Sequence, residues 1–143
     1  MDGPPGFREP SIVQRFVGAV LDGFVLMPLA AISLAVDDEW AAVVVPLLGA
    51  AYQVGMHARD GQTLGKKAMG TRVVHQDTGE QISLGQAVVR WAIFLLGTLA
   101  AWALDWDGAD ALWALLVLLP VLRPPLHQGL HDLAAKTVVT SLR

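Results

Sequence analysis

The chain has 143 residues, of which 54% are hydrophobic and 16% are charged, and its formal net charge is −3 at pH 7. This composition excludes an ordinary soluble domain and indicates a protein embedded in lipid. The chain shows no basic surface of the kind that nucleic-acid-binding proteins use, and it contains no cysteine. Disulfide bonds and thiolate-bound zinc or iron–sulfur clusters are therefore excluded, and the length fits one domain.

The N-terminal part of the chain divides into a tail and a hydrophobic helix. Residues 1–11 are rich in proline and glycine and lack an apolar period, which predicts a flexible tail. Ser11 is well placed to cap a helix over 12–36, which is long enough to cross a bilayer. A cleaved signal peptide is disfavoured, because this apolar run is too long and contains Asp22.

Two charged residues, Arg15 and Asp22, interrupt this first hydrophobic run. At 1.5 Å per residue, Asp22 lies about 15 Å along the helix from Ile12, close to the middle of a ~30 Å hydrocarbon layer. An ionised carboxylate at that depth costs between about 2.5 and more than 10 kcal/mol. Asp22 is therefore the first candidate for a functional residue.

Three further apolar runs complete an all-α membrane protein with four predicted transmembrane helices. The predicted spans are 12–36, 40–58, 87–104 and 110–123, with a polar loop at 59–86 and an interfacial C-terminal segment at 124–143. The apolar part of the fourth run covers only about 18 Å, so a re-entrant or strongly tilted helix remains the alternative there.

The basic residues predict the orientation of these helices. Apart from Arg15, near the start of the first span, and Arg123, at the end of the fourth, every lysine and arginine lies in the tail, in the 59–90 region or in the C-terminal segment. The loops 37–39 and 105–110 carry only acidic charges. Because positive residues stay in the cytoplasm, both termini and the long loop are predicted to face inward at the cell membrane. A three-helix arrangement would place the C-terminal basic residues outside and is disfavoured.

The long loop carries several local signals. Residues 63–69 can form a short amphipathic helix ended by Gly70, with Lys66 and Lys67 placed among lipid headgroups or serving only to set the topology. The segment GQTLGKK does not have the spacing of a phosphate-binding loop. Turn residues at 76–80 suggest a β-hairpin between 71–75 and 81–83, and the β-prone segment 137–140 is a candidate to pair with it.

Two histidines in the C-terminal segment, His127 and His131, are four residues apart and would share one face of a helix. They are weak candidates for a metal pair, because zinc requires three or four ligands and the spacing of the other residues supplies none. Histidines at an interface, facing water or headgroups, are the preferred interpretation. No metal and no cofactor is predicted.

Three segments resemble the RDD family of small integral membrane proteins. They are RFVGAVLDG in the first hydrophobic run, DGQTLGKKAMGTRVV in the long loop and LHDLAAKTVV near the C-terminus. The family is named for one arginine and two aspartates, and the resemblance assigns these to Arg15, Asp22 and Asp132. It implies a membrane protein whose relatives are thought to move small ligands or ions, with sodium/proton exchange proposed for some. The fourth hydrophobic run lies outside the family's minimal two-helix core.

The charged residues suggest two functions. Arg90, at the cytoplasmic start of the third span, and Asp132 are candidate partners of Arg15 and Asp22, which would form a chain of charges from the cytoplasm to mid-membrane. Asp22 could then exchange protons for cations. Four helices leave little room for a gated path, so this hypothesis favours a pore shared between protomers.

The alternative is an accessory or scaffold subunit of a larger membrane complex, in which the Arg/Asp set is a structural polar clasp. No nucleophile–base pair is visible in the sequence, so an enzyme is not expected. Apart from the lipid bilayer, a second copy of the chain or a larger membrane complex is the expected partner, and nucleic acid is not.

Overall fold

A computed structural model describes residues 3–36, 40–106 and 108–143, so the acidic turn expected at 37–39 lies outside the described residues. Its helices are α1 (Ile12–Ala35), α2 (Ala41–Asp60), α3 (Leu64–Met69), α4 (Leu84–Leu104), α5 (Ala109–Leu118) and α6 (Leu130–Ala135). A short 3-10 helix, η1 (Leu119–Leu122), follows α5, and two strands, β1 (Thr71–His75) and β2 (Thr137–Ser141), form one sheet.

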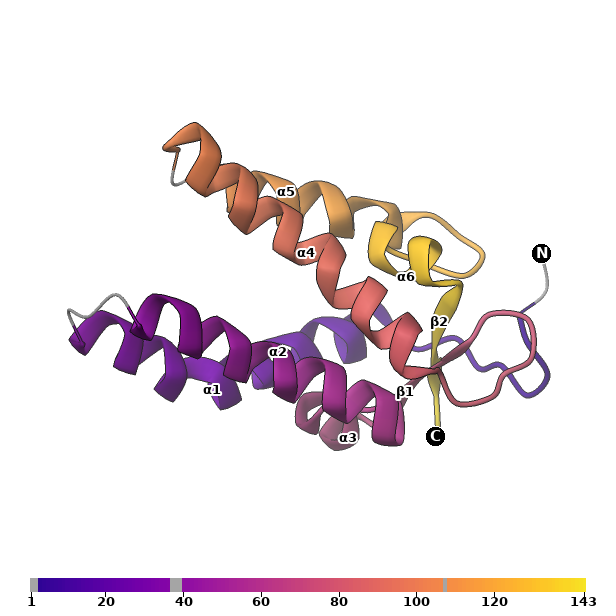
Figure 1. Ribbon diagram of the computed structural model, residues 1–143. Coiled ribbons are helices and arrows are strands. Elements are labelled where there is room, and N and C mark those ends of the chain that lie inside the picture. The colour runs from indigo at the N-terminus through magenta and orange to yellow at the C-terminus, as the bar shows by residue number, and fades with distance from the viewer. Residues whose placement is uncertain (1–2, 37–39, 107) are drawn as a thin grey trace.

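The long helices form two pairs, α1 with α2 and α4 with α5, which converge where the sheet, α3 and α6 lie (Figure 1). The predicted hydrophobic helices are therefore confirmed as helices, with ends that differ by a few residues. Of those in the described part, residues Ile12–Ile32 and Leu84–Leu104 are long and apolar enough to cross a membrane, whereas the fourth run is shorter.

Capping explains where two of the long helices begin. The Ser11 hydroxyl accepts a hydrogen bond from the Gln14 backbone, and the Gln14 side chain accepts one from the Ser11 backbone. Ser83 and Gln86 form the same reciprocal arrangement at the start of α4. Each pair satisfies two backbone groups that a helix leaves open at its first turn.

The strand pairing differs from the predicted hairpin. β1 pairs antiparallel with β2 along its whole length, from Thr71 opposite Ser141 to His75 opposite Thr137. The segment 81–83 keeps only a single bridge, between Val74 and Gln81. The predicted hairpin is therefore reduced to this bridge and to the hydrogen bond from the His75 backbone to the Glu80 carbonyl, on the edge of β1 opposite β2. The predicted involvement of 137–140 is confirmed.

The sheet carries a small apolar core on each of its faces. Val73 and Val139 pack with Ile82 and Ala87 on one face, and Val74 and Val138 pack with Leu126 on the other. These clusters join the start of α4 and the loop before α6 to the sheet. They fix the end of the molecule from which both helix pairs extend.

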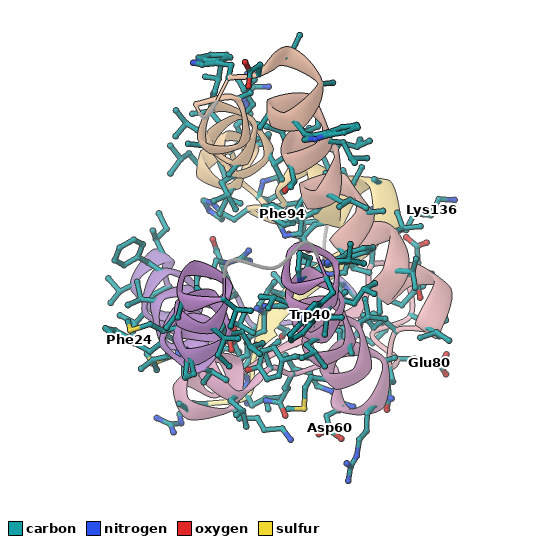
Figure 2. All side chains as sticks on the ribbon, turned by 60° about the vertical axis from the view of Figure 1, so that its left-hand side comes forward. Phe24, Trp40, Asp60, Glu80, Phe94 and Lys136 are labelled. Atoms are coloured by element: carbon teal, nitrogen blue, oxygen red, sulfur yellow. The ribbon has the colours of Figure 1, made fainter. Side chains whose placement is uncertain are left out.

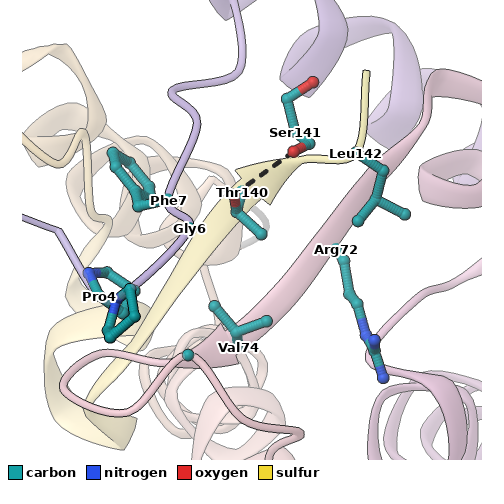
Figure 3. A pocket seen from close by; sticks show the side chains of 10 residues that line it. Pro4, Gly6, Phe7, Arg72, Val74, Thr140, Ser141 and Leu142 are labelled. Atoms are coloured by element: carbon teal, nitrogen blue, oxygen red, sulfur yellow. Dashed lines mark hydrogen bonds between the residues drawn. The ribbon is translucent and has the colours of Figure 1, made fainter.

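The flexible tail predicted at 1–11 is corrected by the structure in its described part. The backbone carbonyl of Arg8 accepts a hydrogen bond from the Ser141 backbone at 2.8 Å, and Phe7 packs against the Val74 cluster. Figure 3 shows Pro4 and Phe7 above β2, where they line a shallow pocket. Arg72 is the single charged residue among those lining the pocket, so no cluster of titratable groups gathers there.

Large apolar side chains cover the outer surfaces of the long helices. Phe16 is 67% exposed, Phe24 59% and Trp102 84%. Figure 2 shows Phe24 on α1 pointing away from the other helices. Such a surface is unfavourable in water and suits contact with lipid.

Candidate functional site

Asp22 is the centre of a buried hydrogen-bonded site. The residue is 5% exposed, and one carboxylate oxygen accepts hydrogen bonds from the Tyr52 hydroxyl and the Gly65 backbone N–H, both at 2.8 Å. The other oxygen accepts from the Thr63 hydroxyl at 2.5 Å. The Lys66 ammonium lies 4.0 Å from that same oxygen. Asp22 on α1 thus binds α2 and the start of α3.

A tight turn between α2 and α3 places the start of α3 beside Asp22. Gly61 ends α2 in the left-handed conformation, with φ of 68°, and Thr63 is the extended residue that precedes α3. A side chain at Gly65 would lie 2.9 Å from the Asp22 backbone nitrogen and would overlap the Gly18 carbonyl. Glycine at position 65 is therefore what lets α3 lie directly against α1.

Replacing Gly65 by alanine is expected to separate α3 from α1, because a Cβ there would meet backbone atoms of α1. We expect the free energy of unfolding to fall by about 1–3 kcal/mol, as for other overpacked sites. Thermal denaturation in detergent measures this loss. Gly55→Ala is the matched control, since no described atom lies within 4 Å of the Cβ that alanine would add and alanine favours a helix. An equal effect of both substitutions would contradict the tight contact.

Lys66 does not occupy the surface position predicted for it. Its side chain is 19% exposed and turns toward Asp22, so its assignment to lipid headgroups is corrected. Burial lowers the pKa of Lys66, and the neighbouring Arg90 lowers it further, while Asp22 opposes this shift. Lys67 is 42% exposed, and its ammonium lies 2.5 Å from an Asp60 carboxylate oxygen. Its contact with headgroups stays a prediction.

Arg15 lies apart from Asp22 and binds backbone carbonyl groups. Its guanidinium donates to the carbonyls of His127 at 2.7 Å, Val139 at 3.2 Å and Leu126 at 3.4 Å. The planar guanidinium can serve several acceptors at once in a fixed geometry, which a lysine cannot do. Arg15 therefore links α1 to β2 and to the loop before α6 by hydrogen bonds.

A second buried site joins α4, α6 and β2. Arg90 and Asp132 are 5% and 1% exposed, and a guanidinium nitrogen of Arg90 donates to one Asp132 oxygen. The same nitrogen lies 2.5 Å from the Thr137 hydroxyl. The other Asp132 oxygen accepts from the Gly129 backbone at 3.2 Å. This site holds the C-terminal segment against α4.

The continuous chain of charges predicted from Arg15 to Asp22 is therefore replaced by separate sites. Asp132 pairs with Arg90, which was one of the predicted alternatives. Asp22 has Lys66 as its nearest cation in place of an arginine. Helix spacing could not predict this, because α3 enters between the charges and occupies the position next to Asp22.

The predicted histidine pair does not share a helix face. His127 precedes α6, has a φ of 48°, and its Nε2 lies 2.7 Å from a Glu9 oxygen. His131 lies inside α6, with its ring 4.9 Å from that of Phe94. Within the described ranges, no group of three histidine, aspartate or glutamate side chains could hold a metal ion.

Several residues that contact the buried charges were missed from the sequence, namely Tyr52, Thr63, Gly65 and Thr137. Tyr52 is the one tyrosine of the chain and lies in an apolar helix, which was a usable signal for a buried hydroxyl. The other three carry no signal in the sequence alone. Their role follows from the tertiary contact of α3 with α1 and of β2 with α6.

The lipid-type surface and the buried charges define a small helical membrane protein. The chain belongs to the RDD family, whose family model matches residues 9–136 and so includes α5. An uncharacterized protein of Haemophilus influenzae is 28% identical over 109 residues, which cover 76% of this chain and 69% of that relative. No solved structure matches the chain.

Proposed function

We propose that this RDD-family membrane protein exchanges a small cation for a proton at Asp22. The observation that carries the proposal is a buried carboxylate whose nearest cation, Lys66, lies 4.0 Å away, beyond direct hydrogen bonding. The hydroxyl oxygens of Tyr52 and Thr63 surround the same carboxylate. Carboxylate and hydroxyl oxygens are suitable ligands for a hard cation.

The exchange follows from charge balance at the Asp22–Lys66 pair. With Lys66 protonated, the pair is neutral. A monovalent cation that binds Asp22 would make the site positive, unless the Lys66 ammonium releases one proton. Burial lowers the pKa of Lys66 and so favours this release. One cation enters the site as one proton leaves it, and the charge inside the protein stays constant.

The proposal includes a four-helix, multi-pass topology with both termini in the cytoplasm. The described terminal segments, the sheet, α3 and α6 gather at one end of both helix pairs (Figure 1), which supports an even number of crossings. The basic residues of the loop and termini support a cytoplasmic position for that end. Since one chain of this size offers little room for a gated path, we propose that two or more copies assemble. Cross-linking in native membranes that yields only monomers would contradict this assembly.

Ion flux into vesicles tests the exchange. In proteoliposomes loaded with a pH-sensitive dye, an inward sodium or potassium gradient should drive protons out. Asp22→Asn and Lys66→Gln should reduce this flux to the level of empty vesicles, because each removes one charge of the exchanging pair. Lys67→Gln is the matched control, since Lys67 is exposed and lies beside Asp60, and it should retain wild-type flux.

The second candidate is a scaffold protein without transport or catalytic activity. One observation favours it: the buried charges of Asp22, Arg90 and Asp132 and the partly buried Arg15 each bind a segment distant in sequence. Wild-type flux in Asp22→Asn, or no flux in wild type together with co-purification of a membrane partner, would favour this function. No enzymatic chemistry forms part of either proposal.

A further inference from the structure

A contact between Glu9 and His127 joins the N-terminal tail to the loop before α6. A carboxylate oxygen of Glu9 lies 2.7 Å from Nε2 of His127, and the two side chains are 52% and 17% exposed. Glu9 comes shortly before Ser11, the residue that caps α1. The backbone carbonyl of His127 accepts a hydrogen bond from Arg15 on α1 at 2.7 Å. The contact therefore lies where the tail, α1 and the C-terminal segment meet.

The other ring nitrogen of His127 shows how many hydrogens this contact needs. Nδ1 lies 2.6 Å from the carbonyl oxygen of Val121 in η1. A carbonyl can only accept, so Nδ1 carries a hydrogen. A hydrogen between Nε2 and Glu9 is therefore an additional proton, present as an imidazolium facing a carboxylate or as a neutral imidazole facing a carboxylic acid. Without it, the electron pair of Nε2 faces a carboxylate, and the two repel each other.

Glu9 is the acidic partner of the His127 ring in the described part of the chain. The titratable and charged groups of the surrounding elements are Arg8 and Glu9 in the tail, Arg15 in α1, Arg123 after η1, and His131 and Asp132 in α6. Asp132 is paired with Arg90, and the ring of His131 packs against Phe94. Arg15 and Glu9 thus act on His127 with opposite charges.

The tail next to Glu9 is docked on the sheet by uncharged groups. The Arg8 amide donates to the Thr140 hydroxyl at 3.0 Å, and the Arg8 carbonyl accepts from the Ser141 amide at 2.8 Å. Phe7 packs against the Val74 cluster and lies above β2 (Figure 3). The Arg8 and Ser141 amides are protected from exchange with solvent only while the tail is docked, so they report its position.

We propose that the Glu9–His127 contact is a proton-dependent contact that keeps the N-terminal tail on the sheet. With the additional proton bound, the contact holds the tail. As the pH rises, this proton is released to water, Glu9 separates from Nε2, and residues 3–9 leave the sheet more often. Histidine ordinarily changes charge between pH 5 and 8. The inference is independent of the exchange proposed at Asp22, and it makes the tail responsive to pH on the side that the proposed topology places in the cytoplasm.

Amide hydrogen exchange of the full chain in detergent, from pH 5 to 8.5, tests this contact. Protection factors, which correct for the intrinsic effect of pH, should fall about 3- to 5-fold at Arg8 and Ser141 as the pH rises, the size expected for one partly exposed ion pair. The fall should have the same midpoint as the His127 ring in nitrogen NMR of wild type. Constant protection, or a different midpoint, would overturn the proposal.

The sign of the change separates this contact from global unfolding. Burial lowers the pKa of His131, so the global stability falls as the pH falls. Opening of the Glu9–His127 contact has the opposite sign, because protection of the tail is lost as the pH rises. A loss of tail protection only toward low pH would therefore overturn the proposal.

The substitution Glu9→Gln removes the proton dependence while keeping a hydrogen-bonding partner. The glutamine amide can donate to Nε2 of a neutral ring and can accept from an imidazolium. Protection of the Arg8 and Ser141 amides should then be independent of pH. Glu80→Gln is the matched control, since Glu80 is exposed in the turn after β1, and it should keep the wild-type pH dependence. Wild-type pH dependence in Glu9→Gln would overturn the proposal, and so would its loss in Glu80→Gln.

Discussion

Asp22→Ala protein in detergent should unfold with a free energy about 3–5 kcal/mol below that of wild type, the usual effect of removing one partner of a buried charge pair. The substitution leaves Lys66 without its counter-charge in a mostly buried position. It also deprives the Thr63 hydroxyl and the Gly65 N–H of their acceptor. We therefore expect α3 to leave α1, which thermal denaturation and proteolysis at the α3 segment would both report.

Graded variants identify the cause of this loss. Asp22→Asn keeps an oxygen that can accept hydrogen bonds and should retain more stability than Asp22→Ala. Combining Asp22→Asn with Lys66→Met removes both charges and should recover part of the loss. Asp60→Ala is the surface control, since Asp60 and Lys67 are 30% and 42% exposed, and it should destabilise the protein far less than Asp22→Ala. Stability of Asp22→Ala equal to that of Asp60→Ala would show that Asp22 does not hold α3.

Local patterns in the sequence predict the helices because their causes are local. The capping boxes at Ser11 and Ser83 and the left-handed Gly70 after α3 are signals within a few residues of each helix end. Hydrophobic length likewise predicts the long helices. These features depend on backbone hydrogen bonding and burial in lipid, which each segment satisfies largely by itself.

The partners of the buried charges depend on tertiary contacts and could not be predicted in the same way. The position of Asp22 along the first helix predicted a high free-energy cost for its charge. Its three hydrogen-bond donors, however, come from residues 30 to 43 positions away in the sequence. The lysine pair looked equivalent in the sequence, whereas one turn of α3 directs Lys66 to Asp22 and Lys67 to Asp60. The full pairing of β1 with β2, beside a single bridge to Gln81, also depends on burial that no short pattern encodes.

Asp132→Ala is expected to detach the C-terminal segment from α4, with a loss of about 3–5 kcal/mol in the free energy of unfolding. The substitution leaves the Arg90 guanidinium buried without a counter-charge and removes the acceptor for the Gly129 backbone. Because Thr137 begins β2, the loss should extend to the sheet. Amide hydrogen exchange across 130–141 measures this, and β2 amides should exchange faster than in wild type.

Lowering the pH should also destabilise wild type, in two steps that each reduce the free energy of unfolding. Burial lowers the pKa of His131 to about 4, so between pH 6.5 and about 4 the unfolded chain binds a proton that the folded protein does not, and stability falls as pH falls. Burial raises the pKa of Asp132, but the charges of Arg90 and His131 and the hydrogen bonds from Arg90 and the Gly129 backbone together outweigh it and hold that pKa well below its ordinary value of 3.8. Stability provided by Asp132 is therefore complete above pH 3.8 and is lost only at lower pH.

The double variant Arg90→Met with Asp132→Leu distinguishes a required ion pair from a replaceable one. Apolar residues of similar volume remove both desolvation costs, so this protein should be at least as stable as Asp132→Ala and can approach wild type. It should also lose the acid-induced step below pH 3.8 while retaining the step from His131. A double variant less stable than Asp132→Ala would contradict this account, because it would mean that Thr137 and Gly129 depend on the charges themselves.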